Sequence, residues 1–218
     1  MILQIANALE ATDLDVVIEA AAQAGFSSGR GTAGRVARTV KNNLQADDSP
    51  QVRGLLELVE KRLRSHPLLL SAARPRRFVK LMLSRYEPGM AYGSHVDNAL
   101  MNGHRTDLSF TLFLSTPSGY EGGELVMEDS SGERAWKPEA GGLLLYPSTT
   151  LHRVAEVTRG ARLAVVGWIE SRVRSAERRE ILFDLEAAMS GEFDANGKTE
   201  QYDRLSKSFN NLLRHWLD

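Results

Sequence analysis

The sequence contains no cysteine, and this absence excludes several kinds of chemistry. A disulfide framework, an iron–sulfur cluster, a zinc site with thiolate ligands and a cysteine nucleophile all need the missing residue. Any metal ion that the protein binds therefore has to be held by His, Asp and Glu side chains.

The chain also lacks long hydrophobic runs and an excess of either charge. No segment approaches the ~18–20 apolar residues of a membrane helix, and Met1 to Glu10 contain no basic segment followed by an apolar one. The 27 Lys and Arg residues nearly balance the 28 Asp and Glu residues, so the composition does not favour binding to nucleic acid or anionic membranes. We therefore expect a cytoplasmic protein that binds neither.

Two helices are expected in the first part of the chain. Thr12 is a candidate N-cap for the first helix, and Gly25 is placed to end it. Ser49 as cap and Pro50 at the first helical position mark the second, which runs to His66.

From about residue 77 the hydrophobic period becomes that of strands. Short segments rich in β-branched and aromatic residues are separated by turn clusters rich in Gly, Pro and Ser. Six or more strands with no helix between them favour an antiparallel sandwich or jelly roll. The expected strands are residues 78–86, 108–115, 124–128, 142–146, 151–157 and 162–169.

The helical period returns after residue 172. One apolar stripe begins at Ile181 and is expected to end at Gly191, and another runs from Tyr202 to Trp216. Helices of this kind either cover a sheet face or form a contact in a homodimer, and the pattern does not distinguish the two.

These changes of period divide the 218 residues into three regions, and the fold class is α+β. Residues 1–76 form an N-terminal helical support region, residues 77–171 the strand-rich core, and residues 172–218 a C-terminal helical extension.

A possible metal site lies in the strand region. His95 and Asp97 stand two residues apart, and at alternating strand positions their side chains point to the same side. His152, at the start of a later strand, completes a set of two histidines and one carboxylate, which leaves about three coordination positions open. His104 is an alternative third ligand, although its glycine-containing loop favours a solvated side chain.

Arg162 follows ten residues after His152 and opens another strand. Its permanent charge and forked geometry suit a carboxylate, such as the distal carboxylate of a keto acid. The strand period gives Ala164, Val166 and Trp168 the same facing as Arg162.

Taken together, these motifs resemble those of Fe(II)- and 2-oxoglutarate-dependent dioxygenases of the prolyl hydroxylase type. Further segments resemble the bacterial PKHD-type hydroxylases and extend the likeness over nearly the whole chain. The motifs are Tyr86-x-x-Gly89-x-x-Tyr92-x-x-His95-x-Asp97, Gly122-Gly123-Glu124-Leu125, Pro147-x-x-x-Leu151-His152 and Gly160-x-Arg162, with Thr32-Ala33-Gly34, Val40-Lys41-Asn42-Asn43-Leu44-Gln45 and Asn211-Leu212-Leu213-Arg214-x-Trp216 for the bacterial group.

The resemblance implies a double-stranded β-helix core with Fe(2+) on His95, Asp97 and His152 as the catalytic centre. It also implies 2-oxoglutarate paired with Arg162, and Tyr86 is the candidate for a hydrogen bond to this cosubstrate, although a strand tyrosine is also a common core residue. L-ascorbate is a further expected cofactor. The implied reaction consumes 2-oxoglutarate and O₂, gives succinate and CO₂, and hydroxylates a peptidyl side chain or a small molecule, with a link to iron uptake.

Two other functions remain open at this stage. The same barrel could be a noncatalytic sensor of metal or 2-oxoglutarate that uses its helical tail as a partner surface. It could also be a cupin-like isomerase or hydrolase, against which Arg162 counts. Lys41, Asn42 and Asn43 are either substrate contacts or an exposed loop.

Overall fold

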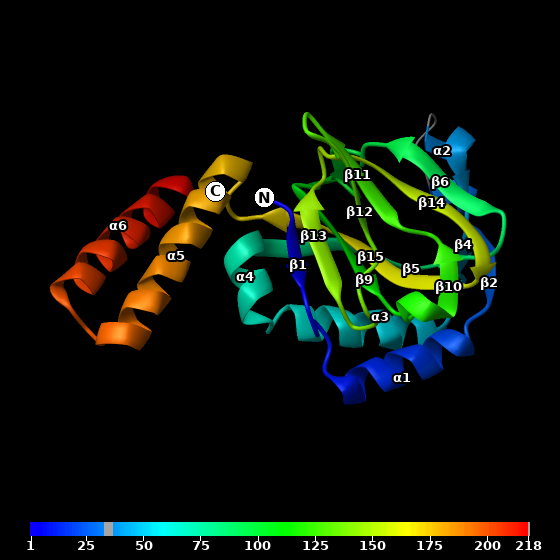
Figure 1. Ribbon diagram of the computed structural model, residues 1–218, viewed down its shortest axis with the longest axis horizontal. Coiled ribbons are helices and arrows are strands. Elements are labelled where there is room, and N and C mark those ends of the chain that lie inside the picture. Colours follow the sequence, from blue (N-terminus) through cyan, green and yellow to red (C-terminus); the bar gives the residue numbers. More distant parts are fainter. Residues whose placement is uncertain (33–36, 218) are drawn as a thin grey trace.

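Two antiparallel sheets form the core of the computed structural model, which describes residues 1–32 and 37–217 (Figure 1). Ala33 and Gly34, which belong to one of the resembling segments, lie outside the described residues. The facing sheets with helices around them confirm the expected jelly roll and the α+β class.

The larger sheet has seven strands and the smaller has six. The larger sheet consists, in spatial order, of β1 (Leu3–Ile5), β13 (Leu143–Pro147), β9 (Leu108–Phe113), β15 (Arg162–Ser171), β5 (Pro75–Tyr86), β4 (Leu44–Ala46) and β2 (Phe26–Ser28). The smaller sheet consists of β12 (Gly132–Trp136), β11 (Leu125–Asp129), β14 (Leu151–Gly160), β6 (Met90–His95) and β3 (Lys41–Asn42), with β10 (Tyr120–Gly122) also paired to β14. A separate ribbon is formed by β7 (Leu100–Met101) and β8 (His104–Arg105).

All six strands expected from the sequence are present, as β5, β9, β11, β13, β14 and β15. The sequence pattern missed β6 and β12, and it missed the short strands of the N-terminal region. Three of those short strands pair with later ones, β1 with β13, β3 with β6 and β4 with β5. The N-terminal region therefore adds strands to both sheets, while the division at residue 76 stays a prediction.

The two faces of β9 show how the strand period builds two separate cores. Phe110 and Leu112 face outward and pack in a cluster with residues of the N-terminal helices. Phe113 faces the smaller sheet and packs in a second cluster with residues such as Leu125 and Val154. Because successive side chains alternate in direction, the larger sheet is covered on both faces, and its inner face is available to line a site.

Helices cover the outer face of the larger sheet and one edge of the molecule (Figure 1). The helices are α1 (Ala11–Ala22), α2 (Ala37–Val40), α3 (Pro50–Leu63), α4 (Pro67–Ala73), α5 (Ala176–Asn196) and α6 (Glu200–Trp216), with 3₁₀ turns at Gly29–Thr32 and Pro117–Gly119. None of the helices within the described ranges is long and apolar enough to cross a membrane.

The structure confirms one predicted helix start and corrects another. Ser49 caps α3 by accepting a hydrogen bond from the Val52 amide, as expected. Thr12 does not cap α1, because that helix already begins at Ala11, and Glu10 stands at its N-cap without a side-chain hydrogen bond. His66, the expected end of the second helix, also begins the next one, since its side chain caps α4.

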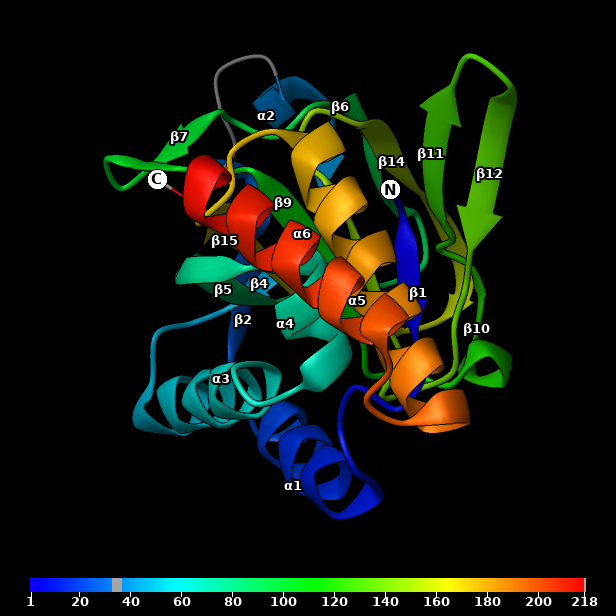
Figure 2. The same cartoon turned by 90° about the vertical axis from the view of Figure 1, so that its left-hand side faces the viewer.

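The C-terminal helices α5 and α6 form a hairpin at the side of the sheets (Figure 2). Glu186 of α5 joins the hairpin to the rest of the chain, because it accepts hydrogen bonds from Ser71 at 2.6 Å and from Arg74 at 2.8 Å. The expected end of α5 at Gly191 is wrong, since the helix continues through this residue to Asn196.

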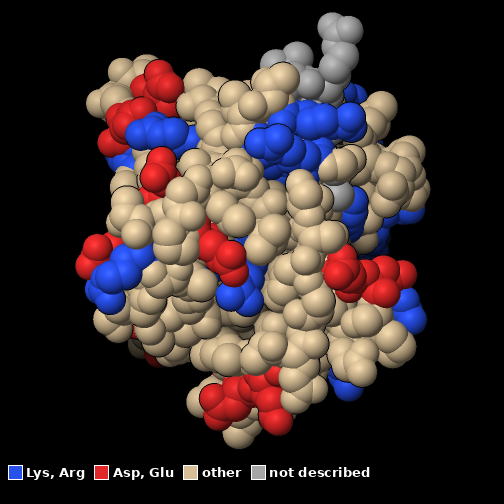
Figure 3. All heavy atoms as spheres, turned by 90° about the vertical axis from the view of Figure 1, so that its right-hand side faces the viewer, with Lys and Arg blue, Asp and Glu red and all other residues tan. Residues whose placement is uncertain are grey.

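Charged side chains of both signs are interspersed on the surface. On the face drawn in Figure 3, small groups of Lys and Arg side chains lie among small groups of Asp and Glu side chains, and the largest basic group lies in the upper part. This mixture agrees with the net charge of -1.

Two glycine substitutions test this account of the backbone. Gly122 has φ +69°, and a Cβ added there would lie 1.9 Å from the Glu156 carbonyl oxygen. We expect Gly122→Ala to lower the free energy of unfolding by about 1–3 kcal/mol. The control is Gly191→Ala in the middle of α5, where a Cβ meets nothing within 4 Å, and where alanine should stabilise by roughly 0.5–1 kcal/mol. Denaturant unfolding measures both, and equal effects would contradict the prediction.

Candidate active site

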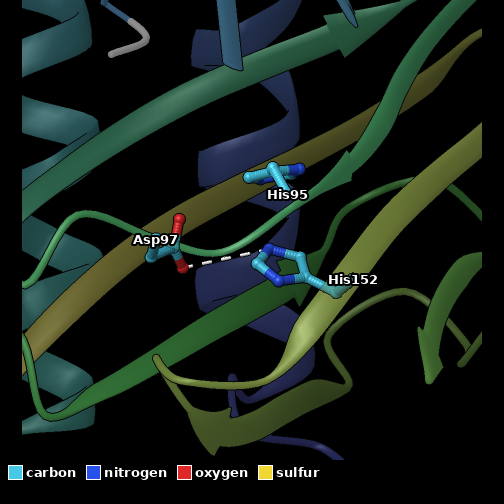
Figure 4. Close-up of side chains that lie close together, drawn as sticks. All are labelled: His95, Asp97 and His152. Atoms are coloured by element: carbon cyan, nitrogen blue, oxygen red, sulfur yellow. Dashed lines mark ion pairs between the residues drawn. The ribbon is translucent and has the colours of Figure 1, made fainter. Parts of the chain in front are cut away.

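Three side chains from two distant segments of the sequence converge between the two sheets (Figure 4). His95 ends β6 and His152 lies directly opposite it on β14, while Asp97 follows β6 by two residues. One ligand atom from each lies within 4.8 Å of the other two, and His152 Nε2 is 3.9 Å from Asp97 Oδ2. The predicted strand position of Asp97 is wrong, because β6 ends at His95. The Asp97 carboxylate nevertheless turns toward the two rings.

Both histidine rings are oriented by backbone carbonyl groups. His95 Nδ1 lies 2.8 Å from the Gly93 oxygen, and His152 Nδ1 lies 2.9 Å from the Thr150 oxygen. A neutral ring that donates from Nδ1 presents the lone pair of Nε2, which is the form that binds a metal. Burial lowers the pKa of His95 to about 4, and the nearby His152 acts in the same direction. His95 is therefore neutral at pH 7.

Two serines position the carboxylate of Asp97. The Ser109 hydroxyl donates to Asp97 Oδ2 at 2.6 Å, and its oxygen lies 2.8 Å from the Ser148 hydroxyl oxygen. Sequence reasoning missed both residues. A signal was available for Ser109, because it is an inward-facing polar residue in the otherwise mostly apolar strand β9.

Arg162 is a buried cation without a counter-ion among the described residues. Its side chain is 1% exposed, and within the described residues its three guanidinium nitrogens have no hydrogen-bond partner. The rings of Tyr86 and Phe113 lie 5.3 and 5.2 Å from its Cζ. Since a buried charge is strongly unfavourable unless it is paired, this arrangement calls for an anion from outside the protein.

Tyr86 lies next to Arg162 because the two residues are register partners on β5 and β15. Burial raises the pKa of Tyr86 to about 12, although the Arg162 charge acts against this shift. The hydroxyl is therefore protonated at pH 7 and can donate a hydrogen bond. The ring also belongs to the core between the sheets.

One pocket contains all of these groups. It is lined by the two histidines, Asp97, Arg162 and Tyr86, and residues of both sheets form its walls. Trp168 lines it as expected from its facing.

Two of the three residues in the segment 41–43 line the same pocket, and the third does not. Lys41 and Asn43 line it, whereas the Asn42 amide group donates to the Gly89 carbonyl at 3.0 Å. The alternative of a wholly exposed loop is therefore wrong, because Lys41 and Asn43 are buried.

His104 is not part of this cluster. It lies on β8, where Nε2 is 2.9 Å from Arg77 Nη1 and Nδ1 is 3.9 Å from Glu170.

Gly122 and Gly123 permit a close approach of the backbone near the pocket, because a Cβ on Gly123 would lie 3.1 Å from Arg162 Cδ.

Comparisons with known proteins agree with this combination of fold and pocket. A family model described as the 2OG-Fe(II) oxygenase superfamily matches residues 81–170. A PKHD-type hydroxylase of Idiomarina loihiensis is 50% identical over 219 residues, with all of both chains covered. A second, from Parvibaculum lavamentivorans, is 54% identical over 217 residues and 99% of each chain.

A solved structure shows the same fold at lower identity. A prolyl-4-hydroxylase of Pseudomonas putida is 23% identical, with a TM-score of 0.54 over 78% of this chain and 92% of the other. The fold and the family match define an oxygenase of the class that uses Fe(II) and 2-oxoglutarate. More specifically, the chain belongs to the PKHD-type hydroxylases.

Ser109→Ala tests how the carboxylate is positioned. Loss of the hydrogen bond to Asp97 should weaken Fe(II) or Co(II) binding by about 10-fold to 100-fold, because ligands without their outer hydrogen bonds are less well oriented. Anaerobic metal titration of the purified variant measures this. Ser94→Ala is the control, since Ser94 is an exposed neighbour of His95, and equal affinity of both variants would contradict the assigned role of Ser109.

Proposed function

We propose that His95, Asp97 and His152 are the iron ligands and that Arg162 binds the distal carboxylate of 2-oxoglutarate. On this proposal the protein hydroxylates a peptidyl side chain or a small molecule with O₂, giving succinate and CO₂, and residues 77–171 are its catalytic core. The observation that carries the proposal is the unpaired Arg162 guanidinium, buried in the same pocket as the three ligands.

The donor set fits a divalent iron ion. Two neutral imidazole nitrogens and one carboxylate suit Fe(II), and with three protein ligands the remaining positions stay open for a cosubstrate and O₂. When bound, Fe(II) supplies the oxidising chemistry that O₂ and 2-oxoglutarate drive. The hydrogen bonds that the imidazole Nδ1–H groups donate to the Gly93 and Thr150 carbonyls hold the ligand atoms toward one point.

The protein's own groups supply charge and shielding. The Arg162 guanidinium can form a bidentate pair with a carboxylate, and Tyr86 can donate its phenolic proton to the same cosubstrate. Phe113 and Leu125 exclude water around these groups, because both are buried between the sheets. A keto acid held in this way would be fixed by its charge at one end and by the metal at the other.

Several finer features belong to the same proposal. L-ascorbate would act as a reductant that keeps the iron ferrous, the protein would work in the cytoplasm, and the α5–α6 hairpin would contribute to a homodimer contact. The link to iron uptake belongs to the proposal as well. The hydroxylase names of the relatives support turnover over a noncatalytic sensor.

Replacement of Arg162 tests cosubstrate binding. We expect Arg162→Ala to weaken binding of 2-oxoglutarate by roughly 100-fold, because two charge-assisted hydrogen bonds are lost. Anaerobic titration of the Fe(II) protein with 2-oxoglutarate measures the affinity. Arg159→Ala is the control, because Arg159 is exposed and pairs with Glu121 at the surface. Unchanged binding in Arg162→Ala would overturn the assignment.

Replacement of Asp97 tests catalysis and separates an enzyme from a sensor. The wild type should convert 2-oxoglutarate to succinate in the presence of Fe(II) and O₂, and Asp97→Ala should lose this conversion because one ligand of three is missing. Succinate is measured directly.

Mass spectrometry of metabolite and peptide pools for an added oxygen, with Asp97→Ala as the blank, then identifies the substrate. Absence of succinate with the wild type would favour the sensor.

A further inference from the structure

The pocket contains two lysines to which the proposed reaction gives no role. Lys41 and Lys80 both line it; Lys41 is 4% exposed and Lys80 is half-buried. Among the described residues that line the pocket, Asp97 is the one carboxylate, and the metal site uses it. The part of the pocket outside the metal and cosubstrate positions is therefore cationic.

Lys41 approaches the metal position from the smaller sheet. It is the register partner of Tyr92 on β6, and its Nζ lies 5.1 Å from the centre of the Tyr92 ring. That ring stacks on His95, with centroids 3.6 Å apart and planes 14° from parallel. A single aromatic ring thus lies between the Lys41 ammonium and one proposed iron ligand.

Lys80 approaches from the larger sheet. It is the register partner of Trp168, and Trp168 is in turn the partner of Ser109, whose hydroxyl donates to Asp97. Lys80 therefore lies on the Asp97 side of the metal position, while Lys41 lies on the His95 side.

The carboxylate at Arg162 does not account for Lys80. On β15, Arg162 and Trp168 are six positions apart, and at ~3.3 Å per residue their backbones are separated by roughly 20 Å. Arg162 is the register partner of Tyr86 at one end of this face, and Trp168 is the partner of Lys80 at the other. An anion beside Lys80 is therefore a different group from the carboxylate at Arg162.

An unpartnered donor stands at the same end of the pocket. The indole of Trp168 is 8% exposed, and its Nε1 has no hydrogen-bond partner within the described residues. Since a buried donor without an acceptor is unfavourable, this N–H also calls for an acceptor from a bound molecule.

The two ammonium groups influence each other. Burial lowers the pKa of Lys41 to about 8, and the charge of Lys80 acts in the same direction. Lys41 is still mostly protonated at pH 7. No carboxylate in the described part of the chain forms an ion pair with Lys80, so an anion between the lysines would relieve their repulsion.

We propose that Lys41 and Lys80 bind a carboxylate of the substrate, with the Trp168 N–H as a third donor, and so place an acidic substrate beside the metal. The inference rests on the proposed function and names the substrate class. A neutral analogue of the same shape would leave the Lys80 ammonium without a counter-charge and the Trp168 N–H without an acceptor, so the pocket discriminates against it.

A matched pair of small probes tests this subsite. Trifluoropropanoate and its neutral amide, trifluoropropanamide, are similar in shape and differ in charge. Fluorine NMR titrations use the full-length protein with Zn(II) in place of Fe(II) and with saturating 2-oxoglutarate, so that Arg162 is occupied. We expect the carboxylate to bind the wild type roughly fivefold to tenfold more tightly than the amide.

Variants assign that preference to the lysines. Lys80→Met should remove most of the preference and Lys80→Arg should retain it, because arginine keeps the charge. Trp168→Phe should weaken carboxylate binding by removing the N–H. Lys207→Met is the matched control, since Lys207 is exposed on α6, and it should bind both probes as the wild type does.

Two results would overturn the proposal, and they are distinct from a failure of the proposed function. The subsite is wrong if the amide binds as tightly as the carboxylate, or if Lys80→Met behaves like Lys207→Met. Conversion of 2-oxoglutarate to succinate by the wild type is measured in parallel. A carboxylate preference without any such conversion would overturn the proposed function, and with it the substrate assignment, leaving only an anion-binding pocket.

Discussion

The antiparallel pairing of β6 with β14 determines where the functional side chains lie. It places His95 directly opposite His152, although 57 positions separate them in the sequence. A shift of one residue in this pairing would turn one ring to the opposite face of the sheet, and the ligand atoms could no longer meet at one point. The register shifts that follow along β14 lie beyond this pair. Packing between the sheets, which includes Val154 and Val157 of the same strand, holds the register in place.

The buried Arg162 illustrates a conflict between stability and binding. Its guanidinium lies between two aromatic rings and has no counter-ion in the described structure, so the ligand-free fold carries an uncompensated charge. A bound carboxylate would remove this penalty, and binding would therefore stabilise the folded chain as well as fill the pocket. The Asp97 carboxylate is stabilised differently, because the protein itself supplies a hydrogen-bond donor to it, the Ser109 hydroxyl.

Local signals in the sequence predicted a large part of this structure. Ser49 and Pro50 predicted the start of α3 because capping depends on neighbouring residues only, and the strand period predicted six core strands. Gly191 was misread as a helix end, because about 1 kcal/mol of unfavourable propensity is tolerated within a long helix that packs against α6. Family resemblance and spacing together predicted the metal set and Arg162, and the structure brings these residues into one pocket. Lys80 and Ser148 could not be found in this way, because only the tertiary fold brings Lys80 to the pocket and Ser148 to Ser109.

The first strand of the chain has a consequence for how the protein forms during synthesis. β1 pairs with β13, so Leu3 has no strand partner until Leu145 has been synthesised. The pocket walls are likewise incomplete until β15 has been synthesised. Contacts between distant segments slow folding, because the closure of long loops precedes the contacts that reward it. A growing chain of this fold therefore exposes unpaired strand edges until β13 and β15 have been synthesised. We expect the nascent chain to acquire affinity for metal and cosubstrate only after β15 has been synthesised.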